Sequence, residues 1–138
     1  MIVFVDTGAW IALLNRNDRH HEQALSYYDE AAKTAVRLLT SSDVVDETAT
    51  RLRYDVGLPA ALAFRTMLDD AVASRRARIA WVDEGVSREA WALLERFADI
   101  ELSLTDATSA VVARRSKVST VFGFDRDFRA LGFDLKPI

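Results

Sequence analysis

The chain has 138 residues, a formal net charge of −3 and no cysteine. This length suits one domain, which we expect to span residues 1–138, and a composition that is half hydrophobic argues against disorder. The lack of cysteine excludes disulfides and thiolate-bound zinc. The sequence also has no apolar run near the roughly 20 residues of a membrane span and no basic leader. Together these features predict a cytoplasmic protein.

The first predicted element is a short buried strand at residues 2–5, which are all β-branched or aromatic. This strand ends on Asp6, with small residues behind it. Burying a lone carboxylate costs free energy, so the sequence predicts that Asp6 faces a functional site. The alternative is that Asp6 caps the short helix predicted at residues 8–14.

Helical and extended segments alternate along the rest of the chain. We predict helices at residues 20–35, 41–56, 59–74, 87–97 and 103–115, and strands at residues 36–40, 79–82, 119–122 and 133–135. Asp18 and Ser87 are the predicted caps of the first and fourth of these helices. The alternation predicts a single-domain, three-layer α/β/α fold with a central, mostly parallel sheet of four to five strands.

Apolar residues at helical spacing predict which face of each helix points inward. The predicted inward faces are Ala24, Leu25, Tyr28 and Ala32; Val45, Ala49, Leu52 and Val56; and Ala90, Leu93, Leu94 and Phe97. In residues 103–115 the small residues Ala107, Ala110 and Ala113 recur. Trp10, Leu13, Leu14, Tyr27 and Tyr28 could belong either to the core or to an interface with another chain.

Four carboxylates are predicted to meet at one edge of this sheet. Ligands of such folds bind at the carboxyl ends of the strands, and Asp6 ends the first strand. Glu47 and Asp106 fall in the opening turns of helices that start at the same edge, and Asp125 follows the strand at residues 119–122. Four converging carboxylates repel one another, so they require a cation; no lysine lies nearby, which favours Mg²⁺ or Mn²⁺. The hydroxyls of Thr7 and Thr105 could orient ligands or water.

Each later carboxylate also has an ordinary structural interpretation. Glu47 lies off the predicted apolar face and could form a surface pair with Arg51, while Asp43 and Asp46 are rival acids in the same turn. The remaining alternatives are a capping box of Ser103 with Asp106, and a tight turn for Asp125 and Asp127.

Four short motifs occur in an order that resembles the PIN-domain nucleases, and most closely the VapC-type toxins of toxin–antitoxin pairs. They are Asp6-Thr7 after an apolar strand, Thr40-Ser41 followed by Val45 and Glu47, Leu104-Thr105-Asp106-Ala107, and Gly123-Phe124-Asp125-Arg126-Asp127-Phe128. The resemblance covers essentially the whole chain. One departure is Gly123, where threonine or serine is frequent in the family.

The resemblance implies an Mg²⁺-dependent endoribonuclease that attacks RNA phosphodiesters with metal-activated water. It assigns one or two ions to Asp6, Glu47, Asp106 and, as the fourth ligand, Asp125, with Asp127 as the alternative fourth ligand. It also implies a homodimer and an antitoxin that blocks the acidic site. The alternatives are a free-standing PIN nuclease of RNA processing and a non-catalytic metal- or RNA-binding module.

Residues that would hold RNA are less distinct in the sequence. Arg16, Arg126 and Arg129 lie in segments expected near the edge of the sheet that carries the acids, and each could contact phosphate. Trp10 could stack on a base, although core packing is the stronger interpretation. His20 and His21 are interpreted as surface or packing residues rather than as a catalytic base.

Overall fold

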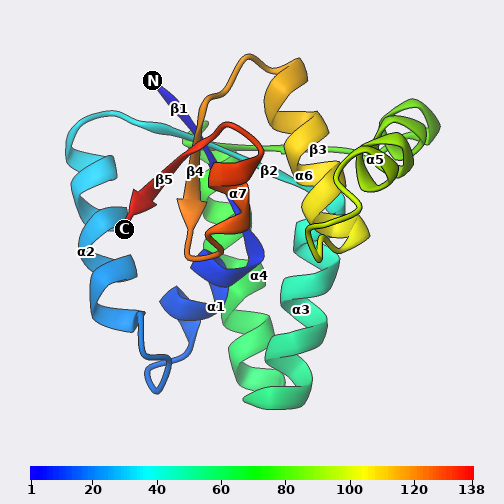
Figure 1. Ribbon diagram of the computed structural model, residues 1–138. Helices are drawn as coiled ribbons and strands as arrows, with labels where there is room; N and C mark the ends of the chain where they lie inside the picture. The colour runs from blue at the N-terminus through cyan, green and yellow to red at the C-terminus, as the bar shows by residue number, and fades with distance from the viewer.

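The chain folds around one parallel sheet with helices packed on both sides, described for all of residues 1–138 by a computed structural model (Figure 1). The strands are β1 Ile2–Val5, β2 Arg37–Ser41, β3 Ala77–Ala80, β4 Thr120–Gly123 and β5 Asp134–Pro137. The helices are α1 Thr7–Leu14, α2 His21–Lys33, α3 Ser42–Asp55, α4 Leu58–Ala73, α5 Glu84–Arg96, α6 Leu104–Arg115 and α7 Asp127–Ala130. This architecture confirms the predicted α/β fold.

The strand order β3-β2-β1-β4-β5 places a topological switch point between β1 and β4, and all four strand pairs are parallel. The chain builds outward from β1 to β3 and then returns past β1 to β4. Right-handed crossovers therefore place α1–α4 on one face of the sheet and α5–α7 on the other. Folds of this kind bind ligands outside the carboxyl ends of the strands at the switch point, which is where β1 delivers Asp6.

Two elements start more than one residue away from the predicted position. Helix α5 begins at Glu84 instead of near Ser87, because Asp83 Oδ1 accepts the Val86 amide at 2.9 Å and so provides the cap. Strand β3 begins at Ala77, where it pairs with Leu38 of β2, and not at residue 79. The arginines around Ala77 hid the start of this edge strand, whose outer positions are open to solvent.

The inward faces of α2 and α3 were predicted correctly at Ala24 and Leu52, but other positions were one residue off. In α3 the buried residues are Val44, Thr48 and Leu52, and in α2 they are Ala24 and Ala31. The correction to α3 has a consequence for the site, because Glu47 lies three residues after Val44 and thus beside the buried face instead of opposite to it.

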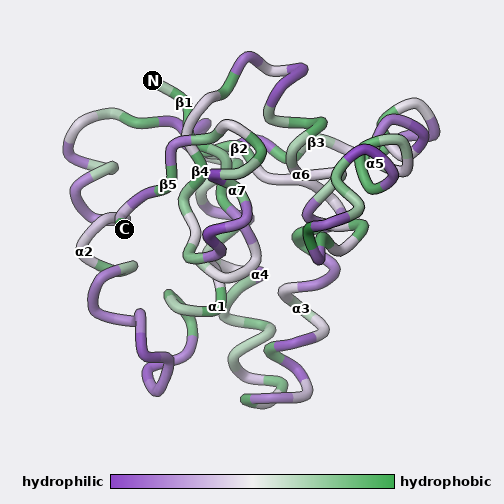
Figure 2. The backbone as a smooth tube through the Cα atoms, viewed as in Figure 1, coloured by the Kyte–Doolittle hydropathy of each residue, from purple (hydrophilic) through white to green (hydrophobic).

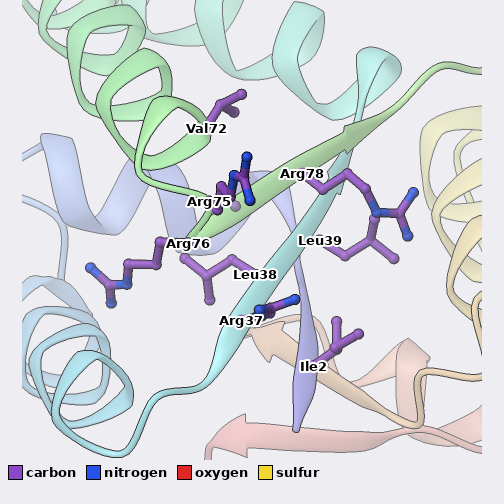
Figure 3. A pocket seen from close by; sticks show the side chains of 9 residues that line it. Ile2, Arg37, Leu38, Leu39, Val72, Arg75, Arg76 and Arg78 are labelled. Carbon is purple, nitrogen blue, oxygen red and sulfur yellow. The ribbon is translucent and has the colours of Figure 1, made fainter.

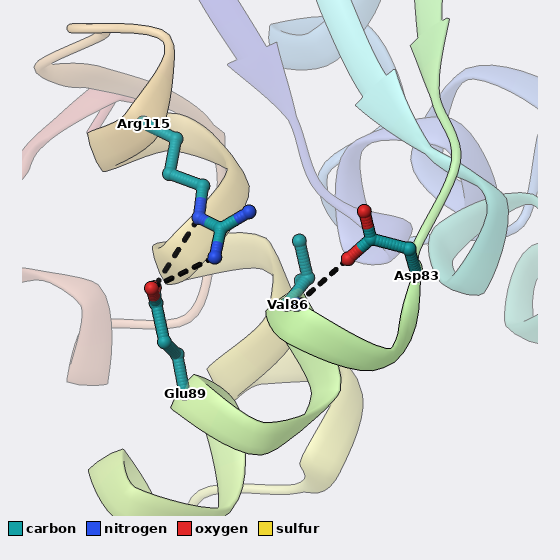
Figure 4. Close-up of polar contacts among 4 residues, drawn as sticks. All are labelled: Asp83, Val86, Glu89 and Arg115. Carbon is teal, nitrogen blue, oxygen red and sulfur yellow. Dashed lines mark hydrogen bonds and ion pairs between the residues drawn. The ribbon is translucent and has the colours of Figure 1, made fainter.

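Helices α5 and α6 pack as a pair that supports one side of the sheet (Figure 4). Arg115 donates from Nη2 and Nε to Glu89 at 2.7 and 3.3 Å, which joins the end of α6 to α5. The alanines predicted on the inner face of α6, Ala107, Ala110 and Ala113, are fully buried. Small side chains let α6 approach its neighbours closely, so its opening turn is held firmly at the edge of the sheet.

The hydrophobic residues gather in and around the sheet, and polar residues dominate the outer helices (Figure 2). Trp10 is fully buried, packs on Phe64 with ring centroids 5.3 Å apart, and donates its indole N–H to Thr40 Oγ1 at 3.4 Å. Trp10 therefore belongs to the core and is not a platform for a base. No helix is both long enough and apolar enough to span a bilayer.

Candidate active site

Asp6 is held at the switch point by its own backbone. Its amide donates to the carbonyl of Phe122 in β4 at 3.0 Å, and its carbonyl accepts the amides of Ala9 and Trp10 in the first turn of α1. Asp6 is the N-cap residue of α1, yet its side chain makes no capping hydrogen bond. The capping alternative for this carboxylate was wrong, and the side chain remains available to the pocket beside it.

The four predicted carboxylates line one pocket at the carboxyl ends of the strands. This acidic pocket has a volume of about 360 Å³ and no hydrophobic lining residue. The residues that line it are Asp6, Thr7, Gly8, Glu47, Arg51, Ser103, Asp106 and Asp125. Four separate parts of the chain therefore contribute one acid each: the end of β1, α3, α6 and the loop after β4.

Glu47 lies in the opening half of α3, whose N-cap Ser41 accepts the Val44 amide at 3.2 Å. Glu47 forms no ion pair with Arg51, although the two are four residues apart and line the same pocket. The rival acids Asp43 and Asp46 do not reach the acidic pocket. They line a neighbouring pocket of about 380 Å³ that also includes Glu47, and Asp43 Oδ2 accepts the Thr108 hydroxyl at 2.8 Å.

Asp106 serves both of its suggested roles. Its Oδ2 accepts the Ser103 amide at 2.9 Å, and the Ser103 hydroxyl accepts the Asp106 amide at 3.0 Å, so the capping box is formed. The same carboxylate lines the acidic pocket. The capping hydrogen bond fixes the side chain and leaves Oδ1 free to face the other acids.

Asp125, and not Asp127, lines the acidic pocket. Asp125 Oδ1 accepts the Asp127 amide at 2.9 Å, while Asp127 opens the short helix α7. Gly123 lies directly against the site, because a Cβ built at this position would be 3.1 Å from Asp6 Cβ. The glycine at this position therefore provides the space that the buried Asp6 side chain occupies.

Burial and mutual repulsion raise the pKa of two carboxyl groups in this pocket. Burial is the main reason that the pKa of Asp6 rises from 3.8 to about 7, and the charges of Asp106, Glu47 and Asp125 raise it further. The pKa of Asp106 is also raised, chiefly by burial and then by Asp125, against the lowering effect of its bond from Ser103. A cation in the pocket would reverse this effect, because it would favour the charged carboxylates.

The donor atoms fit a hard divalent ion, because every side-chain ligand candidate is a carboxylate or hydroxyl oxygen. Thr7 Oγ1 is buried and has no hydrogen-bond partner, so it is a spare oxygen at the same pocket. As they stand, no three acidic or histidine side chains are close enough together to hold an ion directly. This spacing suits Mg²⁺, which keeps several of its waters and uses few direct protein ligands. Thr105 instead lines the neighbouring pocket.

The arginines around the site differ from those that we predicted. Arg16, Arg126 and Arg129 are exposed, and none of them lines the acidic pocket, so their contact with RNA stays a prediction. Arg51 does line it, and the sequence analysis assigned that residue only to a surface pair. The feature of the sequence that could have placed Arg51 at the pocket is its position one helical turn after Glu47.

The two histidines pack as expected. His20 stacks on Phe124 with ring centroids 4.1 Å apart and an interplanar angle of 3°, which supports the loop that carries Asp125. His21 Nδ1 lies 2.7 Å from the carbonyl oxygen of Ala12. Both contacts fix α2 against neighbouring segments, and neither histidine lines the acidic pocket.

Comparison with known proteins finds one family and several solved structures of similar fold. The model of the PIN domain family matches residues 3–134. The chain is 36% identical over 99% of both sequences to the 23S rRNA-specific endonuclease VapC20 of Mycobacterium tuberculosis. The crystal structure of that sarcin–ricin loop-cleaving toxin covers 96% of each chain with a TM-score of 0.83 and 35% identity. VapBC2 from Rickettsia felis bound to promoter DNA matches 99% of this chain and 98% of its own with a TM-score of 0.70 at 15% identity, a likeness of fold.

Proposed function

This chain belongs to the PIN domain family, and from that premise we propose that it is a metal-dependent endoribonuclease, the toxin of a VapBC-type toxin–antitoxin pair. The observation that carries the proposal is the convergence of four carboxylates, from four separate segments, on one pocket without hydrophobic lining. Gathering these acids costs free energy, because burial and the neighbouring charges raise the pKa of Asp6 to about 7. The cluster is suited to concentrating a cation.

Asp6, Glu47, Asp106 and Asp125 would hold Mg²⁺, or Mn²⁺ in its place, partly through waters that the ion keeps, with Thr7 beside them. When bound, the ion would lower the pKa of a bound water and neutralise charge on the phosphate. Asp6 would hold the ion as a charged carboxylate, so a bound cation would lower the raised pKa of this group. The capping bond from Ser103 fixes the orientation of Asp106, and the amide of Asp127 does the same for Asp125.

Arg51 is the residue best placed to orient the RNA. It lines the acidic pocket, it is exposed, and it makes no ion pair with Glu47. Its planar guanidinium can donate two parallel hydrogen bonds to a phosphate. Arg51 would therefore position the scissile phosphate beside the carboxylates without holding the ion itself.

The substrate that we propose is 23S rRNA, at the sarcin–ricin loop. The support is the 36% identity to VapC20, which extends over nearly the full length of both chains. A folded RNA loop displays bases and backbone phosphates in a fixed arrangement, which a shaped pocket can recognise. The sequence alone did not distinguish rRNA from tRNA or mRNA.

The test is cleavage of a sarcin–ricin hairpin by the purified protein. Cleavage is expected with Mg²⁺ or Mn²⁺, to stop in EDTA, and to be lost in Asp6→Asn while its circular dichroism spectrum is unchanged. A tRNA transcript serves as the comparison substrate. Cleavage that survives EDTA or the Asp6→Asn substitution would remove the metal and Asp6 from the mechanism, and failure to cut any RNA would favour the non-catalytic alternative.

As part of the same proposal, the protein acts in the cytoplasm as a homodimer and is blocked by a cognate antitoxin. Trp10 and Leu13 are buried within the chain, so they do not form the interface. Large apolar side chains are exposed elsewhere, among them Tyr54, Trp81 and Trp91, which are 82%, 76% and 57% exposed. Light scattering of the purified chain measures the dimer, and co-purification with the product of the adjacent reading frame tests the antitoxin.

A further inference from the structure

Another pocket lies at the amino-terminal ends of β1, β2 and β3, at the opposite end of the sheet from the acidic pocket (Figure 3). Its volume is about 280 Å³. Four of its lining residues are Arg37, Arg75, Arg76 and Arg78, the others are aliphatic, and no acid lines it. We call it the arginine pocket. Nothing in the proposed catalytic site uses these residues.

The register of the sheet brings two of these arginines onto one face. Ile2 pairs with Arg37, and Leu39 pairs with Arg78. Paired residues of parallel strands project to the same face, as do residues two apart on one strand. The side chains of Arg37 and Arg78 therefore share a face with those of Ile2 and Leu39. Arg37 and Arg78 are exposed and Ile2 is 41% exposed, which shows that no helix covers this corner next to the edge strand β3.

The other two arginines come from the connection between α4 and β3. Arg75 has a φ of +62°, and it ends α4 and turns the chain toward β3. Arg76 is partly committed to structure, because its Nη2 donates to the Tyr28 carbonyl at 2.9 Å and its guanidinium lies 4.1 Å from the centroid of the Tyr28 ring. The remaining three arginines, Arg37, Arg75 and Arg78, make no side-chain hydrogen bond or ion pair within the chain.

Uncompensated charge of this kind indicates an anionic ligand. The ion pairs of the protein all lie elsewhere, at Arg65–Asp69, Arg88–Glu84 and Arg115–Glu89. Guanidinium groups match phosphate geometry, and the aliphatic floor formed by Ile2 and Leu39 is suited to a sugar or a base. The chain as a whole carries a charge of −3, so attraction to a polyanion must be local.

We propose that the arginine pocket binds the phosphate backbone of the RNA substrate at a point remote from the cleaved bond. This inference rests on the proposed function. The four residue steps from Ile2 to Asp6 cover about 13 Å at the usual rise of a strand. A folded RNA can span that distance and occupy both pockets, whereas a very short oligonucleotide that fills the acidic pocket cannot.

The experiment measures binding and cleavage separately, with the double variant Arg37→Gln/Arg78→Gln. The matched control is Arg65→Gln/Arg88→Gln, which removes the same charge from exposed residues outside both pockets. Fluorescence anisotropy with a labelled sarcin–ricin hairpin in EDTA measures affinity without cleavage. We expect affinity to fall about tenfold in the double variant only, and the slope of log K against log salt to become shallower by about 1.5, because each lost phosphate contact contributes about 0.7 to 0.9.

Cleavage with Mg²⁺ completes the test. For the hairpin, KM should rise about tenfold in the double variant with kcat unchanged, and cleavage of a short oligonucleotide should match that of the wild type. Equal losses in both double variants, or no loss in either, would overturn the proposal. The proposal would also be overturned if the Arg37→Gln/Arg78→Gln variant lost binding to a labelled polyglutamate peptide but kept its affinity for RNA. That result would identify an acidic peptide as the ligand. Because affinity is measured in EDTA, this result is independent of whether the protein cleaves RNA.

Discussion

The two ends of the sheet carry opposite charges and handle them differently. At the carboxyl ends, four carboxylates share the acidic pocket, and Asp6 is only 5% exposed. At the amino ends, four arginines share the arginine pocket, and Arg37 and Arg78 are exposed. Repulsion between exposed arginines is weakened by water and salt, whereas repulsion between buried carboxylates is not. The acidic pocket thus stores free energy that a cation can release, and the arginine pocket simply attracts anions.

This difference predicts that substitutions at the two ends fail in different ways. Changes in the acidic pocket should alter kcat, metal affinity and stability. Changes in the arginine pocket should alter the affinity for long RNA alone.

The largest effect is expected from Glu47→Gln. It removes one charge that would bind the ion while keeping the size of the side chain, and kcat for RNA cleavage should fall roughly 10²- to 10³-fold, as for the loss of one electrostatic contact in other active sites. The matched control is Asp46→Asn on the same helix, which is exposed and outside the acidic pocket. A comparable loss in Asp46→Asn would show that the neighbouring pocket, and not this one, holds the ion.

A second prediction concerns stability against pH in EDTA. The pKa of Asp6 in the folded chain, about 7, is above its ordinary value of 3.8, so folding favours the protonated form. The stabilisation from this proton is complete below pH 3.8 and is lost as the pH rises through about 7. The difference between these two pKa values corresponds to a loss of roughly 4 kcal/mol in the free energy of unfolding.

Urea unfolding at a series of pH values measures this loss, and Mg²⁺ should restore stability at high pH by binding only the folded chain. Asp6→Asn is the control, because its side chain does not titrate and the decline should flatten. An equally steep decline in Asp6→Asn would assign the effect to other groups, with Asp106 as the first candidate because its pKa is raised in the same direction.

Next in size is the contrast between Asp125→Asn and Asp127→Asn. Only Asp125 lines the acidic pocket, so its variant should lose about 10- to 100-fold in kcat with weaker Mg²⁺ affinity, and the Asp127 variant should stay within about threefold of the wild type. Titration of Mg²⁺ in the cleavage assay gives both quantities. If Asp127→Asn proves the more damaging, the loop after β4 must rearrange when the ion binds.

Much of this acidic end could be predicted from the sequence, because local signals coincided with topology. Asp6 ends a buried strand, and Asp106 sits in a capping box at the start of a helix, so both could be placed at the carboxyl edge from their neighbours alone. Glu47 was harder, because its helix was predicted to face inward at Val45 and Ala49, whereas the buried residues there are Val44 and Thr48.

The arginine pocket could not be predicted in the same way. Its residues come from β2 and from the α4–β3 connection, and nothing local to either segment indicates that β2 and β3 are neighbours in the sheet. The polar character of residues 75–78 even concealed the first residues of β3. Arg51 was missed for a related reason, since spacing along a helix predicts a possible partner but not whether the pair forms.

The smallest effect is expected at Gly123, and it tests how tightly the fold encloses Asp6. A Cβ at this position would lie 3.1 Å from Asp6 Cβ, and the end of β4 is paired on both sides, so Asp6 must shift by a few tenths of an ångström. Gly123→Ser should therefore lower stability by about 1 kcal/mol and kcat by less than tenfold.

The control for stability is Gly8→Ala. A Cβ at Gly8 would meet nothing within 4 Å, and an alanine within α1 should be neutral or stabilising. Unchanged stability in Gly123→Ser would mean that Asp6 has room to move, and the high pKa of its carboxyl group would then depend less on a rigid surrounding than on the three acids beside it.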